Sequence, residues 1–458
     1  MEGEYPSCLA FRSPVVIGAI VTAPATFYNS MMSPSSLSPD LLSFDEAAAL
    51  VVAHAAQRAR FRASVERVSL RQALSRVLAE PLLADSDQPP FARSVRDGFA
   101  CRAREASAHR PLAVAGSTRA GQVSSGSLPR GAAWEIMTGA PVPSGADAVI
   151  MIEHVETGGS PSERTVRLLP PRTVEKGENI VAQGAQARKG HKVLPAGSAM
   201  GAAQIALAAT CGYAELQVFV RPRVAILATG DELVPVHATP APGQIRNSNA
   251  PMLAAMVAAA GGVPWILPAA RDTDKALDSA LAKAAKADLL LITGGVSAGK
   301  FDLVEPALAR SGARFHFTGV RIQPGKPAVF GERPRAGEYA NGKPRSMQWF
   351  FGLPGNPVSS AATFLLFAAP VLGALSGRLV SGPRFALARL AADVKNKPGL
   401  TRFLPAACDF ASPEPQVALV PWQGSGDQAA MARSNCFLVV PEDTHRLHAG
   451  EAVRILLS

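Results

Sequence analysis

The sequence predicts a multidomain protein of the α/β plus β class, built around a doubly wound parallel-sheet domain. Between residues 221 and 375, near-continuous apolar strands alternate with helical runs, a pattern typical of a parallel sheet covered on both faces. Short apolar segments separated by Gly, Ser and Pro fill 89–171 and 382–458, which indicates a small β domain and a C-terminal β-barrel or sandwich. With 458 residues, 48% of them hydrophobic, the chain can build several cores.

The remaining segments complete the expected organisation. A Ser/Pro-rich stretch ends a leader that is either disordered or wrongly assigned, with a signal peptide as a weaker alternative. Two separate segments form a helical and extended N-terminal domain. The expected boundaries are the leader at 1–38, the N-terminal domain at 39–89 and 175–221, the small β domain at 90–174, the α/β domain at 222–376 and the C-terminal β-barrel domain at 377–458.

Three helices are expected in the N-terminal domain. Ser43 and Glu46 form a capping box, and the apolar face that follows predicts a helix ending near Phe61. The run from 69 to 79 also has helical spacing, and so does 199–210.

The α/β domain is expected to alternate regularly. Its strands are predicted at 224–229, 264–267, 288–293, 314–317 and 347–351. Its helices are predicted at 250–260, 274–286, 303–310 and 358–372. The C-terminal domain is predicted to have strands at 384–390, 417–420, 436–440 and 453–457.

Composition excludes several classes of function. The net charge of +10 comes mostly from single Arg residues, without the basic block or the aromatic platform that nucleic-acid binding requires. Five widely spaced cysteines with no Cys-x-x-Cys pair fit reduced thiols and a cytoplasmic location. The sequence predicts no apolar segment long enough to span a bilayer, so no membrane partner is expected.

The first candidate loop is Thr-Gly-Asp-Glu-Leu at 229–233, directly after a predicted strand. The Thr-Gly turn lets backbone N–H groups approach an anion, and Asp231 and Glu232 offer carboxylates to Mg²⁺. An ordinary turn with solvated carboxylates is the alternative.

The second loop, Gly294 to Lys300, matches the spacing of a nucleotide-binding P-loop. Phe301 stands where that motif needs the Ser or Thr that binds Mg²⁺, so a nucleoside triphosphatase is rejected. The paired glycines still predict a loop that wraps closely around a phosphate or a flat ligand. Asp302 is either a helix cap or a ligand contact.

Two more loops follow strands. Gln-Pro-Gly-Lys-Pro at 323–327 would hold Lys326 as a fixed positive charge, unless it is a plain turn. In the run 352–359, Pro357 suits the first position of a helix, which makes Asn356 the N-cap and the helix start an anion site. Each loop alone is weak evidence, whereas all of them at one end of a sheet predict a phosphorylated or anionic small ligand.

Two motifs in the small β domain could not be assigned a chemical role from their residues alone. One places Asp97 before a glycine, and the other is Met-Thr-Gly-Ala-Pro-Val-Pro at 137–143. No Ser-His-Asp order, zinc-protease motif or Cys/His cluster is visible.

Together these segments resemble the MoeA family of molybdopterin molybdenumtransferases, which is related to the E domain of gephyrin. The matching segments occur in family order over about 40–458: 94–100, 137–143, 145–149, 229–233, 294–297, 324–327, 352–359 and 423–426. The resemblance implies an elongated homodimer, with the N-terminal domain as linker and dimerisation domain. A MogA-like α/β domain would bind the pterin, and the partner's small β domain would close over it.

The implied reaction inserts molybdate into adenylylated molybdopterin in the presence of Mg²⁺, and it releases AMP and molybdenum cofactor. The upstream molybdopterin adenylyltransferase and recipient molybdoenzymes are the further partners that the resemblance suggests. The implied catalytic residues are Asp97, Thr138, Asp231 and Lys326, and the implied metal ligands are Asp231 and Asp302. The implied substrate-binding residues are Thr229, Gly230, Glu232, Asn247, Asn249, Thr293, Gly294, Gly295, Ser297, Pro327, Gly355, Asn356, Pro357, Ser359 and Ser425.

The chain departs from the family pattern at several positions. Val95-Arg96 replaces Ala-Met, Ala185 replaces an acidic residue, and Gln323 and Leu400 replace cations, with Arg402 or Arg433 as candidates to compensate. Two alternatives remain open, the first because of these departures and the second because the E domain of gephyrin also serves as a scaffold. One is a family member that uses tungstate or carries the nucleotide-linked pterin with little turnover, and the other is a scaffold protein.

Overall fold

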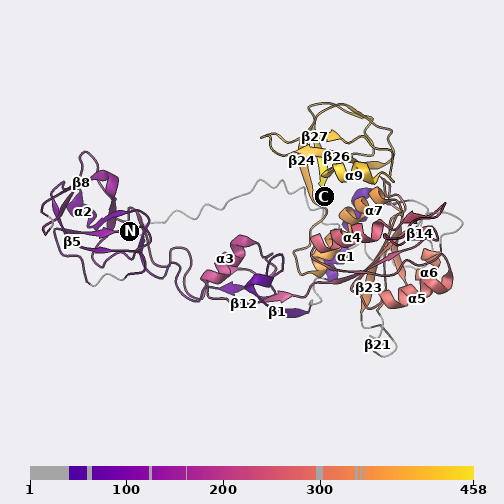
Figure 1. The fold of residues 1–458 in the computed structure, drawn as a ribbon, viewed down its shortest axis with the longest axis horizontal. Helices are drawn as coiled ribbons and strands as arrows, with labels where there is room; N and C mark the ends of the chain where they lie inside the picture. The colour runs from indigo at the N-terminus through magenta and orange to yellow at the C-terminus, as the bar shows by residue number, and fades with distance from the viewer. Residues whose placement is uncertain are drawn as a thin grey trace, which may run out of the picture. The chain divides into compact units, whose positions relative to one another are not determined.

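The structure is a computed structural model, and it describes residues 41–58, 64–122, 126–160, 162–295, 303–335, 339–340, 343–344 and 346–458. The expected leader lies outside these residues. Figure 1 shows the elements in chain order.

The first helix, α1 (Phe44–Arg58), begins where the capping box predicts. The backbone N–H of Ser43 donates to the Glu46 carboxylate at 2.8 Å, and the N–H of Glu46 donates to Ser43 Oγ at 3.2 Å. Arg58 is the last described residue of this segment, so the expected end near Phe61 lies outside the description. The Phe44 ring meets the Phe403 ring edge-on, with centroids 5.3 Å apart, which ties α1 to the C-terminal region.

The predicted helix over 69–79 is wrong. The segment begins with the end of strand β1 (Val65–Ser69), which pairs antiparallel with β12 (Glu215–Phe219), and it continues with a single 3-10 turn, Leu70–Gln72. Ser75 has a φ of 63°, which no helix interior accommodates. The later backbone donors reach distant segments, for example Ala79 N–H to the Gln217 carbonyl of β12 at 3.0 Å. Long-range pairing has overridden local helical spacing.

Two further elements complete this region. Strand β2 (Leu82–Leu83) pairs with β11 (Lys192–Leu194), and α3 (Ala202–Thr210) confirms the third predicted helix.

The small β region contains a sheet with strands in the order β7, β4, β6, β5, β9, β8. Their bounds are Ala148–Met151, Gly98–Cys101, Ala132–Ile136, Leu112–Thr118, Thr165–Leu168 and Val155–Gly158. A separate short pair joins β3 (Arg93–Ser94) to β10 (Ile180–Val181).

The α/β region is built on a sheet with strands in the order β16, β13, β17, β23, β20, β18. Their bounds are Val263–Ile266, Arg223–Ala228, Leu289–Thr293, Met347–Leu353, Val329–Pro334 and Arg314–Thr318. The first four strands run parallel, as predicted. Strand β20 was not predicted, and it runs antiparallel to both of its neighbours.

Strand β20 escaped prediction because its sequence mixes apolar and polar residues. Gly331 leaves room for the Phe350 ring, which a Cβ would meet at 2.4 Å. Arg333 is buried because its guanidinium donates to Gln348 Oε1 at 2.8 Å and to the Leu281 carbonyl at 2.7 Å. The interior thus accepts an arginine that a hydropathy pattern assigns to solvent.

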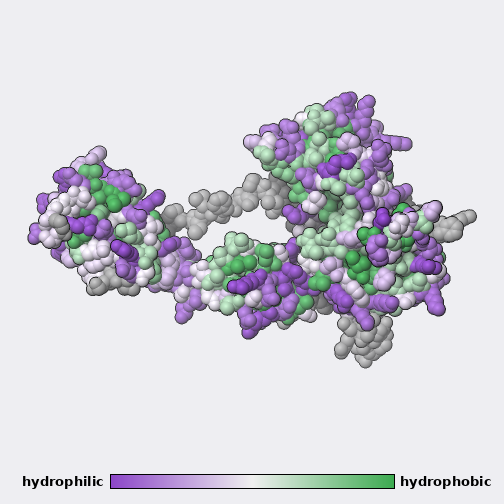
Figure 2. Space-filling model, viewed as in Figure 1, coloured by the Kyte–Doolittle hydropathy of each residue, from purple (hydrophilic) through white to green (hydrophobic). Residues whose placement is uncertain are grey.

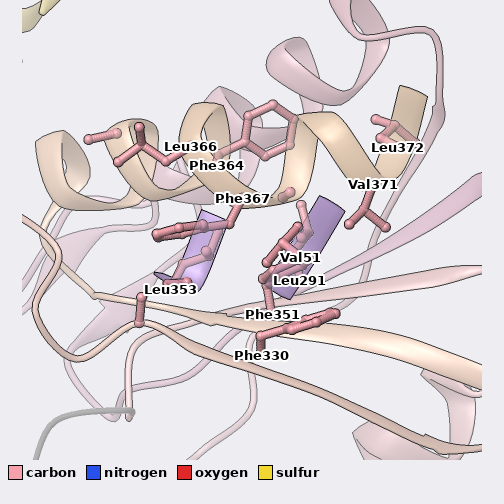
Figure 3. Packing of buried hydrophobic residues seen from close by; sticks show 14 of the residues in the cluster. Val51, Leu291, Phe330, Phe351, Leu353, Phe364, Leu366, Phe367, Val371 and Leu372 are labelled. Atoms are coloured by element: carbon pink, nitrogen blue, oxygen red, sulfur yellow. The ribbon is translucent and has the colours of Figure 1, made fainter. Parts of the chain in front are cut away.

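Helices cover both faces of this sheet. Side chains alternate along the strands, so Val224 and Ile226 face one core while Ala225 and Leu227 face the other. The first core also receives α1, α4 (Asn249–Ala259) and the helical stretch formed by α7 (Pro357–Thr363), the π-helical turn Phe364–Ala368 and α8 (Ala369–Leu375). The second core receives α5 (Asp274–Ala284) and α6 (Val304–Arg310). Figure 3 shows part of the first core, between the long helix and the strands that carry Leu291, Phe330 and Phe351.

The helical stretch Pro357–Leu375 is longer than the sequence predicts, and by length and composition it is apolar enough to cross a membrane. However, 78% of its most apolar window is buried inside the protein, which identifies it as a core helix. Figure 2 shows hydrophilic residues spread over the outer surface of the region that contains it.

The C-terminal region forms a closed β-barrel. Its strands follow the order β26, β27, β24, β30, β28, and β28 pairs back onto β26. Their bounds are Thr401–Asp409, Gln416–Leu419, Phe385–Leu390, Ala452–Leu457 and Cys436–Val440. Strand β26 was not predicted. The short strand β19 (Ile322–Gln323) joins β26 in parallel, so the barrel and the α/β region share a sheet edge. Helix α9 (Gln428–Arg433) lies between β27 and β28 in sequence.

Candidate active site

A pocket of about 1100 Å³ opens at the carboxyl ends of the parallel strands. Its floor consists of residues that directly follow β13, β17 and β23: Thr229–Gly230, Gly294–Gly295 and Pro354–Gly355. Three of the four predicted loops therefore meet, as expected for an open α/β sheet. The fourth reaches the pocket only through Pro327, because it follows β19 rather than a strand of the parallel sheet.

Buried hydrogen bonds hold the floor together. Asn249, at the start of α4, donates through Nδ2 to Thr293 Oγ1 at 2.9 Å and to the Gly355 carbonyl at 2.6 Å. Thr229 Oγ1 and Asn249 Oδ1 are buried without any hydrogen-bond partner. A buried polar atom normally has a partner, so these two atoms indicate a ligand.

The floor glycines allow backbone to approach backbone. Gly294 has a φ of +92°, and a Cβ there would lie 2.5 Å from the Thr229 carbonyl oxygen. A Cβ on Gly355 would lie 3.5 Å from the Cα of Gly294. Neighbouring strand ends therefore form a close-set surface of main-chain groups, which suits a phosphate or a flat ring.

One rim of the pocket is acidic. Glu232 and Asp272 line it, and the neighbouring Asp231 accepts the backbone N–H of Asp272 at 3.4 Å. Burial, and then repulsion from Asp231 and Glu232, raises the pKa of the Asp272 carboxyl. Asp272 was not among the predicted site residues, although it closely follows β16 and the strand-end rule applies to it as well.

A hood formed by residues 233–246 makes another part of the rim, which the sequence did not predict. It contains the short parallel pair β14 (Leu233–Val234) and β15 (Ile245–Arg246). Val236 and Ile245 are 59% and 56% exposed, although both line the pocket. Arg246 donates through Nε to the Ala238 carbonyl at 3.0 Å, and Asn247 Oδ1 accepts the Ala250 N–H at 3.2 Å.

The barrel contributes to the side of the pocket near α7. Asn356 is the N-cap of α7 with Pro357 next, as predicted, but its side chain does not cap the helix. Instead, Asn356 Nδ2 donates to Ser425 Oγ at 2.8 Å, and the Val358 N–H donates to the Ser425 carbonyl at 3.0 Å. The helix start is thus partly occupied by the barrel, which weakens its predicted role as an anion site. Gln428 of α9 also bonds to Ser248 at the start of α4.

The two remaining predicted positions in this neighbourhood do not line the pocket. Lys326 is exposed on a turn whose backbone is fixed, since its carbonyl accepts the Val320 N–H at 2.9 Å. Ser359 is only 4% exposed and lies inside the first turn of α7. Ser297 and Asp302 lie outside the described residues.

Comparison with known proteins identifies the family. Residues 42–212 match the MoeA N-terminal region (domain I and II), 225–374 the probable molybdopterin binding domain and 387–458 the MoeA C-terminal region (domain IV). The chain is 33% identical to the molybdopterin molybdenumtransferase of Staphylococcus aureus (strain Mu50 / ATCC 700699) over 398 residues. This alignment covers 85% of this chain and 90% of that protein. It is 35% identical to the Bacillus subtilis (strain 168) protein of the same name, over 86% of this chain and 89% of that protein. The chain belongs to the MoeA family of molybdopterin molybdenumtransferases.

Solved structures support the same assignment. The fold is similar to the molybdopterin biosynthesis MoeA protein from Pyrococcus horikoshii OT3, with a TM-score of 0.72 and 29% identity over 92% of this chain and 100% of that chain. A molybdenum cofactor biosynthesis protein from Pyrococcus furiosus, 22% identical with a TM-score of 0.54 over 92% of this chain and 100% of that one, shares the fold.

Among the residues that the MoeA resemblance implies, Asp97 and Thr138 lie apart from the pocket-lining set, in the small β region. The backbone N–H of Thr138 donates to Asp97 Oδ1 at 2.6 Å. This hydrogen bond, followed by one from the Thr138 side chain, lowers the pKa of the Asp97 carboxyl. The structure therefore joins the two small-domain motifs that the sequence left unassigned.

Proposed function

We propose that this protein inserts molybdate into adenylylated molybdopterin and releases AMP and molybdenum cofactor. The observation that carries the proposal is the pocket floor, where close-set glycines lie beside the unpartnered Thr229 hydroxyl and the unpartnered side-chain amide oxygen (Oδ1) of Asn249. Such a floor suits a ligand with phosphate oxygens and hydrogen-bonding ring atoms. The described residues include no group of His, Cys, Asp and Glu that could hold a metal ion by itself, and the proposed substrate carries its own sulfur ligands.

This chain's residues have separable tasks in that reaction. The backbone at Gly230, Gly294 and Gly355 binds and orients the phosphate end, while Asn249 and Thr229 fix the substrate from below. Lys326 supplies a positive charge beside the pocket for the oxyanion and the departing AMP. Asp97 and Thr138 act from the small β domain of a second copy, so we propose a homodimer located in the cytoplasm. Recipient molybdoenzymes and the adenylyltransferase are its further proposed partners.

The acidic rim fits a requirement for Mg²⁺. A dianionic pyrophosphate would be repelled by Asp231, Glu232 and Asp272. The pKa of the Asp272 carboxyl is raised first by burial and then by repulsion from the other two carboxylates. Mg²⁺ typically takes one or two carboxylates together with substrate oxygens, which matches a rim without a complete protein cage. Asp231 and Asp272 would hold the ion, and Asp302 is a further proposed ligand. The ion would offset charge on the phosphate that leaves with AMP.

A turnover assay tests the proposal. Purified protein is given adenylylated molybdopterin, Mg²⁺ and either molybdate or tungstate, and AMP release is followed together with reconstitution of an apo-molybdoenzyme. We expect molybdate-dependent AMP release with reconstitution, and at least a tenfold loss in Asp231→Asn and Lys326→Ala. Arg389→Gln, on an exposed barrel strand, is the matched control and should retain the wild-type rate. Tight substrate binding without AMP release would replace the proposal with a carrier role.

A further inference from the structure

Two histidine rings lie stacked where α1 contacts β18, the edge strand of the α/β sheet. The ring centroids of His54 and His316 are 3.9 Å apart, with an angle of 36° between the ring planes. Both rings also contact the ring of Phe330, at centroid distances of 5.7 and 5.0 Å. Val51, one turn before His54 on α1, packs in the same core as Phe330, part of which Figure 3 shows. The histidine pair therefore belongs to the contact that holds α1 on the sheet.

A β-bulge directs His316 toward α1. The pairing of β18 with β20 shifts register between Phe315 and Phe317, so His316 is an extra residue on its strand. Phe315 packs against the second core, whereas Phe317 belongs to the first. In a regular strand, His316 and Phe317 would emerge on opposite faces. The bulge instead lets both side chains reach the first core, where His316 contacts His54 and Phe330.

The docked pair cannot accommodate an additional proton well. His316 Nε2 is buried and has no hydrogen-bond partner among the described residues. A protonated imidazole donates through both ring nitrogens, so a charged His316 would leave a buried N–H without an acceptor. Burial, followed by His54 and Arg314, lowers the pKa of His316 to about 3. Burial, followed by Arg314, also lowers the pKa of His54.

The charged groups of the sheet also favour neutral rings. Arg314 lies on β18, two residues before His316, and its positive charge opposes protonation of both histidines. On β20, the Glu332 carboxylate lies 3.9 Å from the Arg314 guanidinium. Arg333, the next residue on β20, directs its guanidinium to groups of the second core. No carboxylate of these two strands is therefore placed to hold a charged imidazole.

The helical elements around the pair offer no compensating charge either. The π-helical turn Phe364–Ala368 and α8, which also pack against α1, carry no titratable side chain. On α1 itself, Asp45 and Glu46 lie in the first turn, more than one turn before His54. The helix ends at Arg58, one turn after His54, and adds no negative charge.

The start of α1 is joined to the turn that carries Lys326. The Arg321 N–H donates to the Leu42 carbonyl at 2.7 Å, and Leu42 forms a parallel bridge with Val320. The Val320 N–H in turn donates to the Lys326 carbonyl at 2.9 Å. Docked α1 therefore helps to hold the backbone of this turn in place.

We propose that the His54–His316 stack is a pH-sensitive latch, which holds α1 on the sheet while both rings are neutral and weakens when either ring gains a proton. In the undocked state both rings are in water and bind protons with the ordinary affinity of histidine, near pH 6.5. Docking is therefore fully stable above about pH 6.5 and becomes weaker as the pH falls below it. The undocking is independent of the proposed function, whereas its effect on AMP release through the Lys326 turn rests on that function.

Amide hydrogen exchange of the full-length protein tests the latch. Protection factors are compared at pH 7, 6 and 5, so that the intrinsic pH dependence of exchange cancels. From pH 6 to pH 5 the protection of α1 should fall by more than tenfold, since each histidine contributes up to about tenfold per pH unit. The capping box stays ionised in this range, because hydrogen bonds from Ser43 lower the pKa of Glu46. Helix α5, on the second core, is the internal reference and should keep its protection.

Variants that cannot titrate decide the cause. His316→Phe and His54→Phe each keep an aromatic ring, and each should limit the fall to about tenfold or less. The double variant should change by less than about twofold, and His54→Gln should match His54→Phe, which separates charge from ring packing. His445→Gln removes an exposed histidine of the barrel and should behave as wild type. The inference is overturned if wild-type α1 keeps its protection at pH 5, if the double variant loses as much as wild type, or if α5 loses protection equally.

The rate of AMP release tests the connection to the Lys326 turn. The ratio of the rate at pH 5.5 to the rate at pH 7.5 should be at least twofold smaller in wild type than in the double variant, because undocking removes the hydrogen bond between Leu42 and Arg321. Equal ratios would overturn this connection, while the protection factors still decide the latch. If the wild type releases no AMP at either pH, the proposed function fails, and the exchange result is unaffected.

Discussion

The floor and the rim of the pocket are built in opposite ways. Thr229, Asn249 and Thr293 on the floor are at most 9% exposed, and they follow or face strands whose side chains form the two cores. The rim consists of the carboxylates and of the hood, a loop with one short strand pair. Arg246 and the exposed Val236 and Ile245 lie on the hood. Packing thus fixes the shape of the floor, whereas the rim supplies charge and contact area. Substitutions in the two parts should therefore fail for different reasons.

The largest effect is expected from Gly294→Ala on the floor. Its Cβ would lie 2.5 Å from the Thr229 carbonyl oxygen in a left-handed backbone conformation. Roughly 2 kcal/mol or more of unfolding free energy should be lost, with AMP release reduced at least a hundredfold. Gly243→Ala in the hood is the control, because its φ of +84° is similar and no atom lies within 4 Å of its Cβ. Equal losses in both, measured by denaturant unfolding, would mean that backbone strain alone accounts for the effect.

A smaller loss is expected from Asn249→Ala. The change removes the donor for the Gly355 carbonyl and for Thr293 Oγ1, both at the floor. Unsatisfied buried groups of this kind cost about 1–3 kcal/mol. Asn247→Ala at the edge of the hood loses a single longer bond to the Ala250 N–H and should cost under about 1 kcal/mol. Thermal unfolding of both variants checks the order, and the reverse order would contradict a packed floor beneath an adaptable rim.

The same contrast separates the parts of the site that the sequence predicts from those that it does not. Strand-end glycines at 230, 294 and 355 could be placed together because parallel strands end at one edge. The hood could not be predicted, since no local pattern indicates that residues 233–246 contribute to the lining of the pocket. Asp272 was visible in principle, as it closely follows β16. The positions of Gln428 and Ser425 depend on how the barrel contacts α7 and α4. The burial of Arg333 depends on a hydrogen-bond network between β20, β23 and α5. Long-range contacts therefore determine the place of each of these residues.

On the rim, Asp272→Asn should separate function from stability. The change removes repulsion with Asp231 and Glu232, so the unfolding free energy should stay the same or rise slightly. The Mg²⁺ concentration for half-maximal AMP release should rise about tenfold. Asp278→Asn on α5 is the control, because that carboxylate pairs with Arg310 away from the pocket and should leave the Mg²⁺ dependence unchanged. A loss of stability in Asp272→Asn, without a change in Mg²⁺ dependence, would make this carboxylate structural.

The smallest effect is expected from Val236→Ser in the hood. Because the side chain is already 59% exposed, stability should change by less than about 0.5 kcal/mol. If the hood covers bound substrate, that apolar contact is lost, and the KM for adenylylated molybdopterin should rise two- to fivefold at an unchanged kcat. Leu387→Ser, at a barrel position that is 64% exposed, should alter neither constant. A fall in kcat instead of a rise in KM would place Val236 in the chemical step, and the division between a shaping floor and a contacting rim would no longer hold.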